Sequence, residues 1–506
     1  MPFSPINDIV KLYTKSRFRG MQKFLDNPLE VQRDILAKMV KSAACTEYGK
    51  QYGFKFIKTY EEFKRTVPIR EYESLSPYIQ RIRNGEQNVL WPTMIKWFSK
   101  SSGTTDSKSK FIPVSFESIN DNHLKGGKDI LSWYCHCHPE SQLFTGKSLR
   151  LGGSSSVNSI NHESYYGDLS AIIVENLPLW AEIRTTPNQR ISLMPEWETK
   201  MEAMANATIK ENVTSLVGVP SWMLVLSKHI LKKTGVKTLK EVWPNLELYI
   251  HGGVSFKPYR EEFSKLVGEG DMVYTETYNA TEGFFAVQDS FPSKGMLLLL
   301  DHGIFYEFIP LEDFNGEESD AISLNEVELG VTYAMVITTN SGLWRYSIGD
   351  TIRFVSLEPY RIEIVGRTKH FINAFGEELM IDNAISALEV ASKQTGASVK
   401  DYSAAPVYMS DKNTGGHEWI FEFNTAPNDM EVFAKVLDDT LKEVNSDYEA
   451  KRYKNMALHF PVIHEARPNV FYDWLKLKGK LGGQNKVPRL SNSRTILEEL
   501  LELNAQ

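Results

Sequence analysis

Short β-rich runs alternate with helical stretches from about residue 94 to residue 365, and this alternation limits the fold more than any other feature of the chain. A helical stretch over residues 221–233 is followed by Gly235, which can adopt the left-handed backbone that ends many helices. Strands that alternate with helices predict an α/β domain with mixed β-sheets and flanking helices. The β-rich runs include residues 215–219, 246–250, 272–274 and 331–337.

The two ends of the chain have different patterns. Apolar residues recur at helical spacing over residues 31–40, within an N-terminal region of about a hundred residues that we expect to be helical. After Gly366 the pattern restarts as a smaller unit. Its expected elements are a helix over 382–393, strands near 406–408 and 419–423, and a second helix over 429–444. We therefore predict a large N-terminal domain over residues 1–366 and a small C-terminal α+β domain over residues 367–506.

Composition excludes several classes of partner. The chain has 506 residues, is 42% hydrophobic and carries a net charge of -7, so nothing favours nucleic acid or an anionic membrane. The N-terminal segment lacks the apolar core of a signal peptide, and the longest purely apolar run, residues 296–300, is too short to span a bilayer. Three cysteines do not form a disulfide framework. We expect a soluble cytoplasmic protein, and we favour a monomer.

The run from Lys100 to Lys110 is rich in hydroxyl side chains and lysines. Apolar runs that resemble strands flank it, which predicts a loop between two strands. Backbone N–H groups, hydroxyls and cations together suit a polyphosphate, whose charge is spread over many oxygens. A solvated turn fits the segment equally well. No Walker A spacing is present here or around Gly146.

Two further segments place polar groups beside predicted strands. Residues 274–283 combine an aromatic ring, a hydroxyl and a carboxylate in a turn that a glycine closes, which suits a base, a phosphate and Mg²⁺. His251-Gly252-Gly253 ends a strand, and its glycines would let a flat ring approach the backbone. An ordinary polar strand end and a plain turn are the alternatives.

Residues 338–350 end at Asp350, just before a predicted strand over residues 351–354. A carboxylate there suits the two hydroxyls of a ribose, although aspartate is also common in turns. Residues 482–489 form a glycine-hinged loop with a lysine and an arginine, which alone indicates a solvated loop.

Two other segments are weaker candidates. Residues 135–138, Cys-His-Cys-His, resemble metal ligands. On a strand, however, their side chains would alternate between faces, and no second ligand pair at zinc spacing is present. Residues 152–156 resemble a second phosphate loop, but they could instead form a wall of a substrate pocket or a flexible turn, and we favour the turn.

In this order, the segments resemble the motifs of the adenylate-forming superfamily of acyl-CoA synthetases, adenylation domains and luciferases. The likeness is greatest to the auxin-responsive family of acyl acid–amido synthetases, including its bacterial members, and covers about residues 90–490. The matching segments are residues 100–110 (Ser-Ser-Gly-Thr-Thr/Ser), 278–283 (Tyr-x-x-Ser/Thr-Glu-Gly), 343–350 (Tyr-Arg-x-x-x-Gly-Asp, with Trp344 in place of one aromatic), 366–369 (the hinge) and 484–489 (Gln-x-Lys-x-Pro-Arg).

This resemblance implies the adenylate-forming fold, with a small C-terminal domain that rotates about the hinge. It implies ATP and Mg²⁺ as cofactors, and a small carboxylic acid and an amine, such as an amino acid, as substrates. The carboxylate would attack the α-phosphorus to give acyl-AMP and pyrophosphate, and the amine would then displace AMP.

The resemblance also implies roles for particular residues. Tyr278 would stack on adenine, Asp350 would hold the ribose, and Thr281 would serve the phosphates. Glu282 would serve the phosphates and Mg²⁺, and with Lys486, which would stabilise charge at the α-phosphate, it forms the predicted catalytic pair. The remaining candidates are Ser101, Ser102, Gly103, Thr104, Thr105, Lys110, Gly252, Gly253 and Arg367 for the nucleotide, Val219, Pro220 and Trp222 for the acyl pocket, and Lys369 for the hinge.

Two departures from the family pattern leave one assignment open. Ser107 stands where the phosphate loop often has a second glycine, and residues 375–378 stand where plant members place a lysine, so the identity of the catalytic lysine is uncertain. A ligase that forms a thioester with coenzyme A and a non-catalytic ATP-binding protein are the alternative functions. The Gln-x-Lys-x-Pro-Arg segment favours amide formation over the first, and intact Glu282, Asp350 and Lys486 argue against the second.

Overall fold

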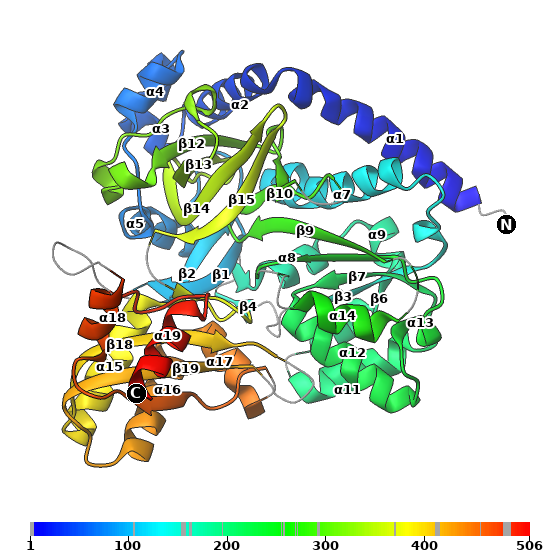
Figure 1. Ribbon diagram of the computed structural model, residues 1–506. Helices are drawn as coiled ribbons and strands as arrows, with labels where there is room; N and C mark the ends of the chain where they lie inside the picture. The colour runs from blue at the N-terminus through cyan, green and yellow to red at the C-terminus, as the bar shows by residue number, and fades with distance from the viewer. Residues whose placement is uncertain are drawn as a thin grey trace.

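The chain forms a large body and a smaller one, which lies at the lower left of Figure 1, and the two termini are on different bodies. The helical N-terminal segment lies along the top of the large body, and α15 to α19 gather in the small body. The structure is a computed structural model that describes residues 5–104, 107–152, 158–160, 164–194, 196–254, 256, 259–268, 270, 272–290, 294–368, 371–409, 415–455, 457–478 and 487–505.

The α-helices of the described residues concentrate at the N-terminus, around the large sheet and in the small body. They are α1 Pro5–Asp26, α2 Pro28–Ala43, α3 Glu47–Gln51, α4 Tyr60–Thr66, α5 Tyr72–Arg83, α6 Phe116–Ser118, α7 Leu124–Cys137, α8 Leu169–Glu175, α9 Leu179–Ile183, α10 Gln189–Ser192, α11 Trp197–Thr208, α12 Pro220–Thr234, α13 Leu239–Val242, α14 Arg260–Val267, α15 Ile381–Thr395, α16 Met430–Val444, α17 Ser446–Arg452, α18 Val470–Leu477 and α19 Thr495–Asn504.

The strands begin after the N-terminal helices. They are β1 Trp97–Thr104, β2 Ser107–Val114, β3 Lys147–Leu151, β4 Asn158–Ser159, β5 Tyr165–Gly167, β6 Thr185–Thr186, β7 Val213–Gly218, β8 Leu248–Gly252, β9 Val273–Ala280, β10 Gly283–Val287, β11 Met296–Leu298, β12 Ile304–Pro310, β13 Thr332–Thr339, β14 Tyr346–Leu357, β15 Tyr360–Arg367, β16 Phe371–Ile372, β17 Leu379–Met380, β18 Ser398–Val407, β19 Gly416–Thr425 and β20 Val462–Glu465.

An eleven-stranded mixed sheet organises the large body. Its order is β12-β13-β14-β15-β11-β10-β9-β8-β7-β3-β6. Strands β6, β3, β7, β8 and β9 are parallel neighbours, and from β9 onward the neighbours are antiparallel. A four-stranded sheet (β2-β1-β5-β4) lies in the same body, and a three-stranded sheet (β18-β19-β20) lies in the small body. The predicted α/β fold with mixed sheets and a small C-terminal α+β unit is confirmed.

Local sequence signals explain several elements. Pro220 begins α12, and Gly235 ends it in the left-handed conformation at φ 74°, as predicted. Helix α2 begins at Pro28, and the expected helical N-terminal region is present as α1 to α5. Helix α16 is capped by the Asp429 carboxylate, which accepts hydrogen bonds from two backbone N–H groups of the first turn. No helix within the described ranges is long and apolar enough to cross a membrane.

Three local predictions need correction. Residues 135–137 end helix α7 rather than forming a strand, so the alternation argument does not apply to the Cys-His-Cys-His segment. Residues 274–280 belong to strand β9 instead of following it, and Asp350 lies inside β14. In the two strands, neighbouring residues extend the element because strand pairing continues through polar side chains.

The run from Lys100 to Lys110 is also more regular than expected. Strands β1 and β2 pair through it, with Ser101 opposite Lys110 and Thr104 opposite Ser107. This ladder engages backbone groups that a phosphate loop would otherwise offer. Residues 105 and 106, between the strands, lie outside the described residues, as do residues 153–157 of the second glycine-serine run.

Candidate active site

A cleft of about 980 Å³ lies where the large sheet meets the small body. Its walls come from the β1–β2 hairpin, from β9 and the turn after it, from β14 and β15, and from the segment that follows β15. Ligands of open α/β sheets commonly bind outside the carboxyl ends of parallel strands, where β8 and β9 end here. The cleft is lined by eight of the predicted site residues: Ser101, Lys110, Gly253, Tyr278, Thr281, Glu282, Asp350 and Arg367.

Strand pairing brings Asp350 and Arg367 together. The two residues are register partners in the β14–β15 ladder, and Arg367 Nε lies 2.9 Å from Asp350 Oδ1. Tyr278 on β9 donates its hydroxyl proton to Asp350 Oδ2 at 2.5 Å. Burial opposes the charge on Arg367, but Asp350 and Glu378 raise the pKa of its guanidinium above the usual value. The cleft therefore contains a carboxylate that contacts both an arginine and a tyrosine hydroxyl.

Glu282 and Lys110 line the same cleft. Burial raises the pKa of the Glu282 carboxyl, whose side chain also accepts a hydrogen bond from Thr281 Oγ1 at 2.5 Å. Burial lowers the pKa of Lys110, against the attraction of Glu282, which raises it. Each charge is thus held partly out of water with the other as an electrostatic partner. A hard cation with its phosphate oxygens would satisfy such a carboxylate, and a phosphate would satisfy such an ammonium.

The two glycines at the end of β8 are explained by the backbone. A Cβ on Gly252 would lie 2.5 Å from the Thr277 carbonyl oxygen of the neighbouring strand, and Gly253 has a φ of 81°. Both positions therefore exclude ordinary side chains. Gly253 lines the cleft, whereas Gly252 packs against β9.

His251, directly before these glycines, is a cleft residue that sequence analysis did not select. Burial and then the nearby Arg260 charge lower the pKa of its imidazole to about 3. Its ring stacks on Phe256 with the ring centroids 4.0 Å apart. Neither ring nitrogen finds a hydrogen-bond partner within the described part of the chain. Its position at the carboxyl end of a parallel strand was the signal that could have selected it.

The predicted acyl-pocket residues lie at the start of α12 and outside the lining of the cleft. Val219 is the residue before the helix, and its Cγ2 lies 3.6 Å from the position of a Cβ on Gly253. Pro220 is buried, and Trp222 is 9% exposed, with the Lys451 ammonium 4.7 Å from its ring centroid. Their role in acid binding stays a prediction.

Several other predicted residues cannot be placed as side chains. Ser102, Gly103 and Thr104 belong to strand β1, where only their backbone is described. Thr105, Lys369 and Lys486 lie outside the described residues. Glu378 and Phe371, which sequence analysis missed, enter the cleft from the segment after β15. Glu378 Oε1 lies 3.6 Å from Arg367 Nη2, so the segment after β15 contributes a carboxylate beside Arg367 in the cleft.

The predicted 343–350 motif divides into two parts with different surroundings. Arg345 lies outside the cleft, where it is 4% exposed and pairs with the fully buried Glu307, Nη2 to Oε1, at 2.9 Å. It also donates hydrogen bonds to the carbonyl oxygens of Lys64 and Val67. Asp350, five residues later, faces the cleft. The first part of the motif is therefore structural.

An Arg345→Lys substitution tests this division. Lysine keeps the charge but loses the planar fork that contacts Glu307 and two carbonyl oxygens. We expect the midpoint of thermal unfolding to fall by a few degrees, for a loss of about 2 kcal/mol. The KM for ATP should stay unchanged, and a selective rise in that KM would contradict the structural assignment.

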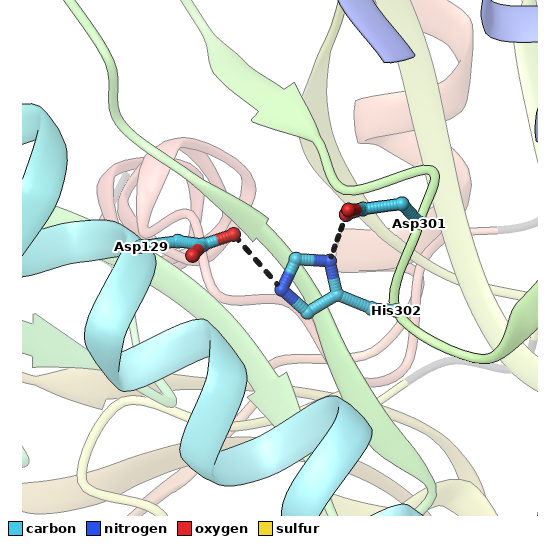
Figure 2. A group of neighbouring side chains, drawn as sticks. All are labelled: Asp129, Asp301 and His302. Atoms are coloured by element: carbon cyan, nitrogen blue, oxygen red, sulfur yellow. Dashed lines mark ion pairs between the residues drawn. The ribbon is translucent and has the colours of Figure 1, made fainter. Parts of the chain in front are cut away.

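Another group of charged side chains lies between α1, α7 and the turn before β12. Figure 2 shows His302 between Asp129 and Asp301, with Nε2 3.2 Å from Asp129 Oδ2 and Nδ1 3.1 Å from Asp301 Oδ1. Arg17 Nε lies 2.6 Å from Asp129, and Lys125 Nζ lies 2.9 Å from Asp301. Two cations already balance these carboxylates. We therefore interpret the group as an ion network that connects α1 to the large body.

Family models match most of the chain. The GH3 family N-terminal domain matches residues 17–272, the GH3 family central domain residues 297–367, and the GH3 family C-terminal domain residues 382–495. The chain belongs to the GH3 family. Asp350 and Arg367 lie within the match to the central domain, and Tyr278 lies between the matches to the N-terminal and central domains.

Curated GH3 relatives are similar over nearly the whole chain. An indole-3-acetic acid-amido synthetase, GH3.3 of Arabidopsis thaliana, is 23% identical over 95% of this chain and 92% of its own length. A 4-substituted benzoates-glutamate ligase, GH3.12 of the same plant, is 23% identical over 98% of both chains. A jasmonoyl–L-amino acid synthetase, GH3.5 of Oryza sativa subsp. japonica, is 26% identical over 64% of this chain and 67% of its own.

Two solved structures share the fold. The GH3.15 acyl acid amido synthetase superposes with a TM-score of 0.61 at 18% identity, covering 99% of this chain and 97% of its own. A 2-hydroxyisobutyryl-CoA ligase superposes with a TM-score of 0.55 at 12% identity, covering 94% and 92%. The predicted adenylate-forming fold is confirmed.

Proposed function

We propose that this GH3 protein is an ATP-dependent acyl acid–amido synthetase. It activates a carboxylic acid as acyl-AMP and transfers the acyl group to an amine such as an amino acid. The observation that carries the proposal is the cleft, in which Tyr278 and Arg367 both contact the Asp350 carboxylate and which Glu282 and Lys110 also line. The GH3 relatives named above, which are amido synthetases and a ligase, support the same reaction.

In this proposal ATP lies along the cleft in a defined orientation. The Tyr278 ring contacts adenine, and Asp350 accepts hydrogen bonds from the ribose hydroxyls. A carboxylate offers about four acceptor positions, so Asp350 can bind the ribose while it keeps Tyr278 and Arg367. The phosphates then extend toward Thr281, Lys110 and the β1–β2 hairpin. Val219, Pro220 and Trp222 border the acyl group.

The proposed reaction has two steps. The acid carboxylate attacks the α-phosphorus of ATP, a P–O bond to pyrophosphate breaks, and acyl-AMP forms. The amine then attacks the acyl carbon, the C–O bond to AMP breaks, and the amide forms with loss of a proton. Lys110 and Lys486 supply positive charge near the phosphates during the first step.

The residues present fit a hard cation such as Mg²⁺. Glu282 supplies a carboxylate oxygen on the cleft wall, and Mg²⁺ is commonly held by one or two carboxylates together with substrate phosphates. When bound, Mg²⁺ would offset the negative charge of the phosphate oxygens.

We propose a division into residues 1–366 and 367–506, with rotation of the second part between the two steps. Several contacts cross this boundary. Tyr259 donates its hydroxyl proton to the Ala374 carbonyl oxygen at 2.6 Å, and Ser221 donates to the Phe375 carbonyl oxygen at 3.2 Å. Phe375 also joins the hydrophobic cluster of α12 and α14. Rotation would have to break these contacts.

A Lys369→Pro substitution tests the proposed hinge. Proline fixes φ near -65°, so it should trap one arrangement of the two parts. We expect acyl-AMP formation to be retained and aminolysis to become slow. Pyrophosphate release and amide formation, measured separately, give the two rates. Lys369→Ala, which removes the side chain but leaves φ free, is the matched control. Equal loss in both steps with normal thermal stability would mean that rotation about residue 369 is not required.

Acid-dependent ATP–pyrophosphate exchange tests the proposed function as a whole. The purified chain is assayed with labelled pyrophosphate and a broad panel of carboxylic acids. We expect exchange with at least one acid and none without acid. No exchange with any acid would instead support an ATP-binding protein without catalysis.

A further inference from the structure

A second hollow, of about 570 Å³, lies far from the cleft. It is enclosed by α2, by the short 3₁₀ helices η1 (Phe54–Phe56) and η7 (Leu324–Glu326), and by the start of β12. Helices α2 and α4 lie at the top of Figure 1, whereas the small body that closes the cleft lies at the bottom. The hollow and the cleft share no lining residue. This hollow is therefore separate from the proposed active site.

The floor of the hollow is apolar and firmly held. Leu36, Val40, Phe54 and Phe305 line it, and all four are buried. Gln32, also in the lining, donates hydrogen bonds to the carbonyl oxygens of Leu300 and Ile304 and accepts one from the Tyr306 N–H. These bonds connect α2 to the sheet and satisfy the amide, so the hollow is a preformed apolar site.

Four cations surround this apolar floor. Arg33, Lys41, Lys55 and Lys58 all line the hollow and are exposed. No aspartate or glutamate belongs to its lining, and none of the four forms an ion pair with any described carboxylate. The whole chain has more acidic than basic residues, so this local excess of positive charge contrasts with the net charge of -7.

We propose that this hollow binds a small anionic amphiphile, with one carboxylate and one aliphatic tail, free in solution. The tail would lie on the apolar floor, where burial of apolar surface is favourable, and the carboxylate would lie among the four cations. The volume is within the range of small-molecule sites. A protein partner is disfavoured, because a stable protein interface buries about 800 Å² on each side.

Equilibrium dialysis of labelled decanoate against the full chain tests the proposal. Decanoate is kept below its micelle concentration, at low salt, where exposed charges act at longest range. We expect saturable binding, and weaker binding of the neutral decanol. An Arg33→Gln, Lys58→Gln double variant should weaken decanoate binding by about fivefold to tenfold at this site. Lys38→Gln, on the same helix but outside the lining, should leave binding unchanged.

A second pair of variants tests the hollow itself. Ala37 lines it and is exposed on α2, so a new side chain there can extend into the hollow without disturbing the core. Ala37→Glu introduces a like charge and should abolish this binding, whereas the isosteric Ala37→Gln should retain more of it. Retained ATP–pyrophosphate exchange and an unchanged thermal midpoint would show that the variants fold.

Three results would overturn the proposal. Parent-like decanoate binding by both Ala37→Glu and the double variant would place the ligand elsewhere. Equal affinity for decanol and decanoate would remove the role of the cations. Sedimentation with phosphatidylglycerol vesicles that depends on the four cations, without binding of monomeric decanoate, would assign the surface to a membrane instead.

Discussion

Glu282→Gln is expected to lower acid-dependent pyrophosphate exchange by about 100-fold to 1000-fold at limiting Mg²⁺. The substitution keeps the shape of the side chain but removes its charge, and a neutral amide is a poorer ligand for a hard cation. Lys110 would also lose its nearby counter-charge in the cleft. A Mg²⁺ titration of the exchange rate should show that the variant needs a higher Mg²⁺ concentration for half-maximal activity.

The matched control for this variant is Glu363→Gln. Glu363 also lines the cleft, but it is exposed and lies 3.4 Å from Arg353. This variant should behave like the parent. If the Mg²⁺ titration of Glu282→Gln overlays that of the parent, Glu282 has a structural role only.

The pH dependence of the parent gives an independent test of the same carboxylate. Burial raises the pKa of Glu282 above the usual value of a glutamate. The carboxylate is needed in its charged form, so kcat/KM for ATP should fall as the pH falls through this raised pKa. Glu282→Gln should lack this acidic limb.

Asp350→Ala is expected to raise the KM for ATP by roughly 30-fold or more, because two hydrogen bonds to a charged acceptor are lost, at about 2–4 kcal/mol together. The KM for the acid should change far less. The substitution also leaves Arg367 without its partner at 2.9 Å, so the thermal midpoint must be measured in parallel. Steady-state kinetics with ATP and acid varied separately give both values.

Tyr278→Phe is the control that separates the loss of the Asp350–ribose contact from the loss of the Asp350–Tyr278 hydrogen bond. It removes the hydroxyl that donates to Asp350 Oδ2 but keeps the ring and the carboxylate. The KM for ATP should therefore rise only slightly. An unchanged KM for ATP in a folded Asp350→Ala variant would remove Asp350 from the ATP site.

Elements with strong local signals were predictable from the sequence. The apolar spacing, Pro220 and Gly235 of α12 act within one helix, and β13 is a continuous β-rich run. The strand argument for the Cys-His-Cys-His segment failed because four alternating residues, here at the end of α7, do not distinguish a helix from a strand. The prediction of a loop over residues 100–110 failed because strand pairing can extend through serine and threonine, as it does in the β1–β2 hairpin.

The candidate site was predictable where the residues of a sequence motif themselves line the cleft. Tyr278, Glu282 and Asp350 were selected in this way, and all three line it. The alignment of two paired strands cannot be deduced from the sequence of one segment. The contact of Asp350 with Arg367 therefore became apparent only from the β14–β15 ladder. The same limit applies to Arg345, whose motif gave no sign that Glu307 would bind it away from the cleft. No motif selected Glu378 or His251, although the end of a predicted strand was a signal for His251.

Product analysis tests the central claim most directly. The chain is first incubated with ATP, Mg²⁺ and an acid that supports exchange, and the trapped acyl-AMP is then divided between an amino acid panel and coenzyme A. Mass spectrometry identifies the products. The account predicts acyl-AMP, followed by an amide with at least one amino acid and AMP release in equal amount. Formation of a thioester with coenzyme A and no amide with any amino acid would contradict it.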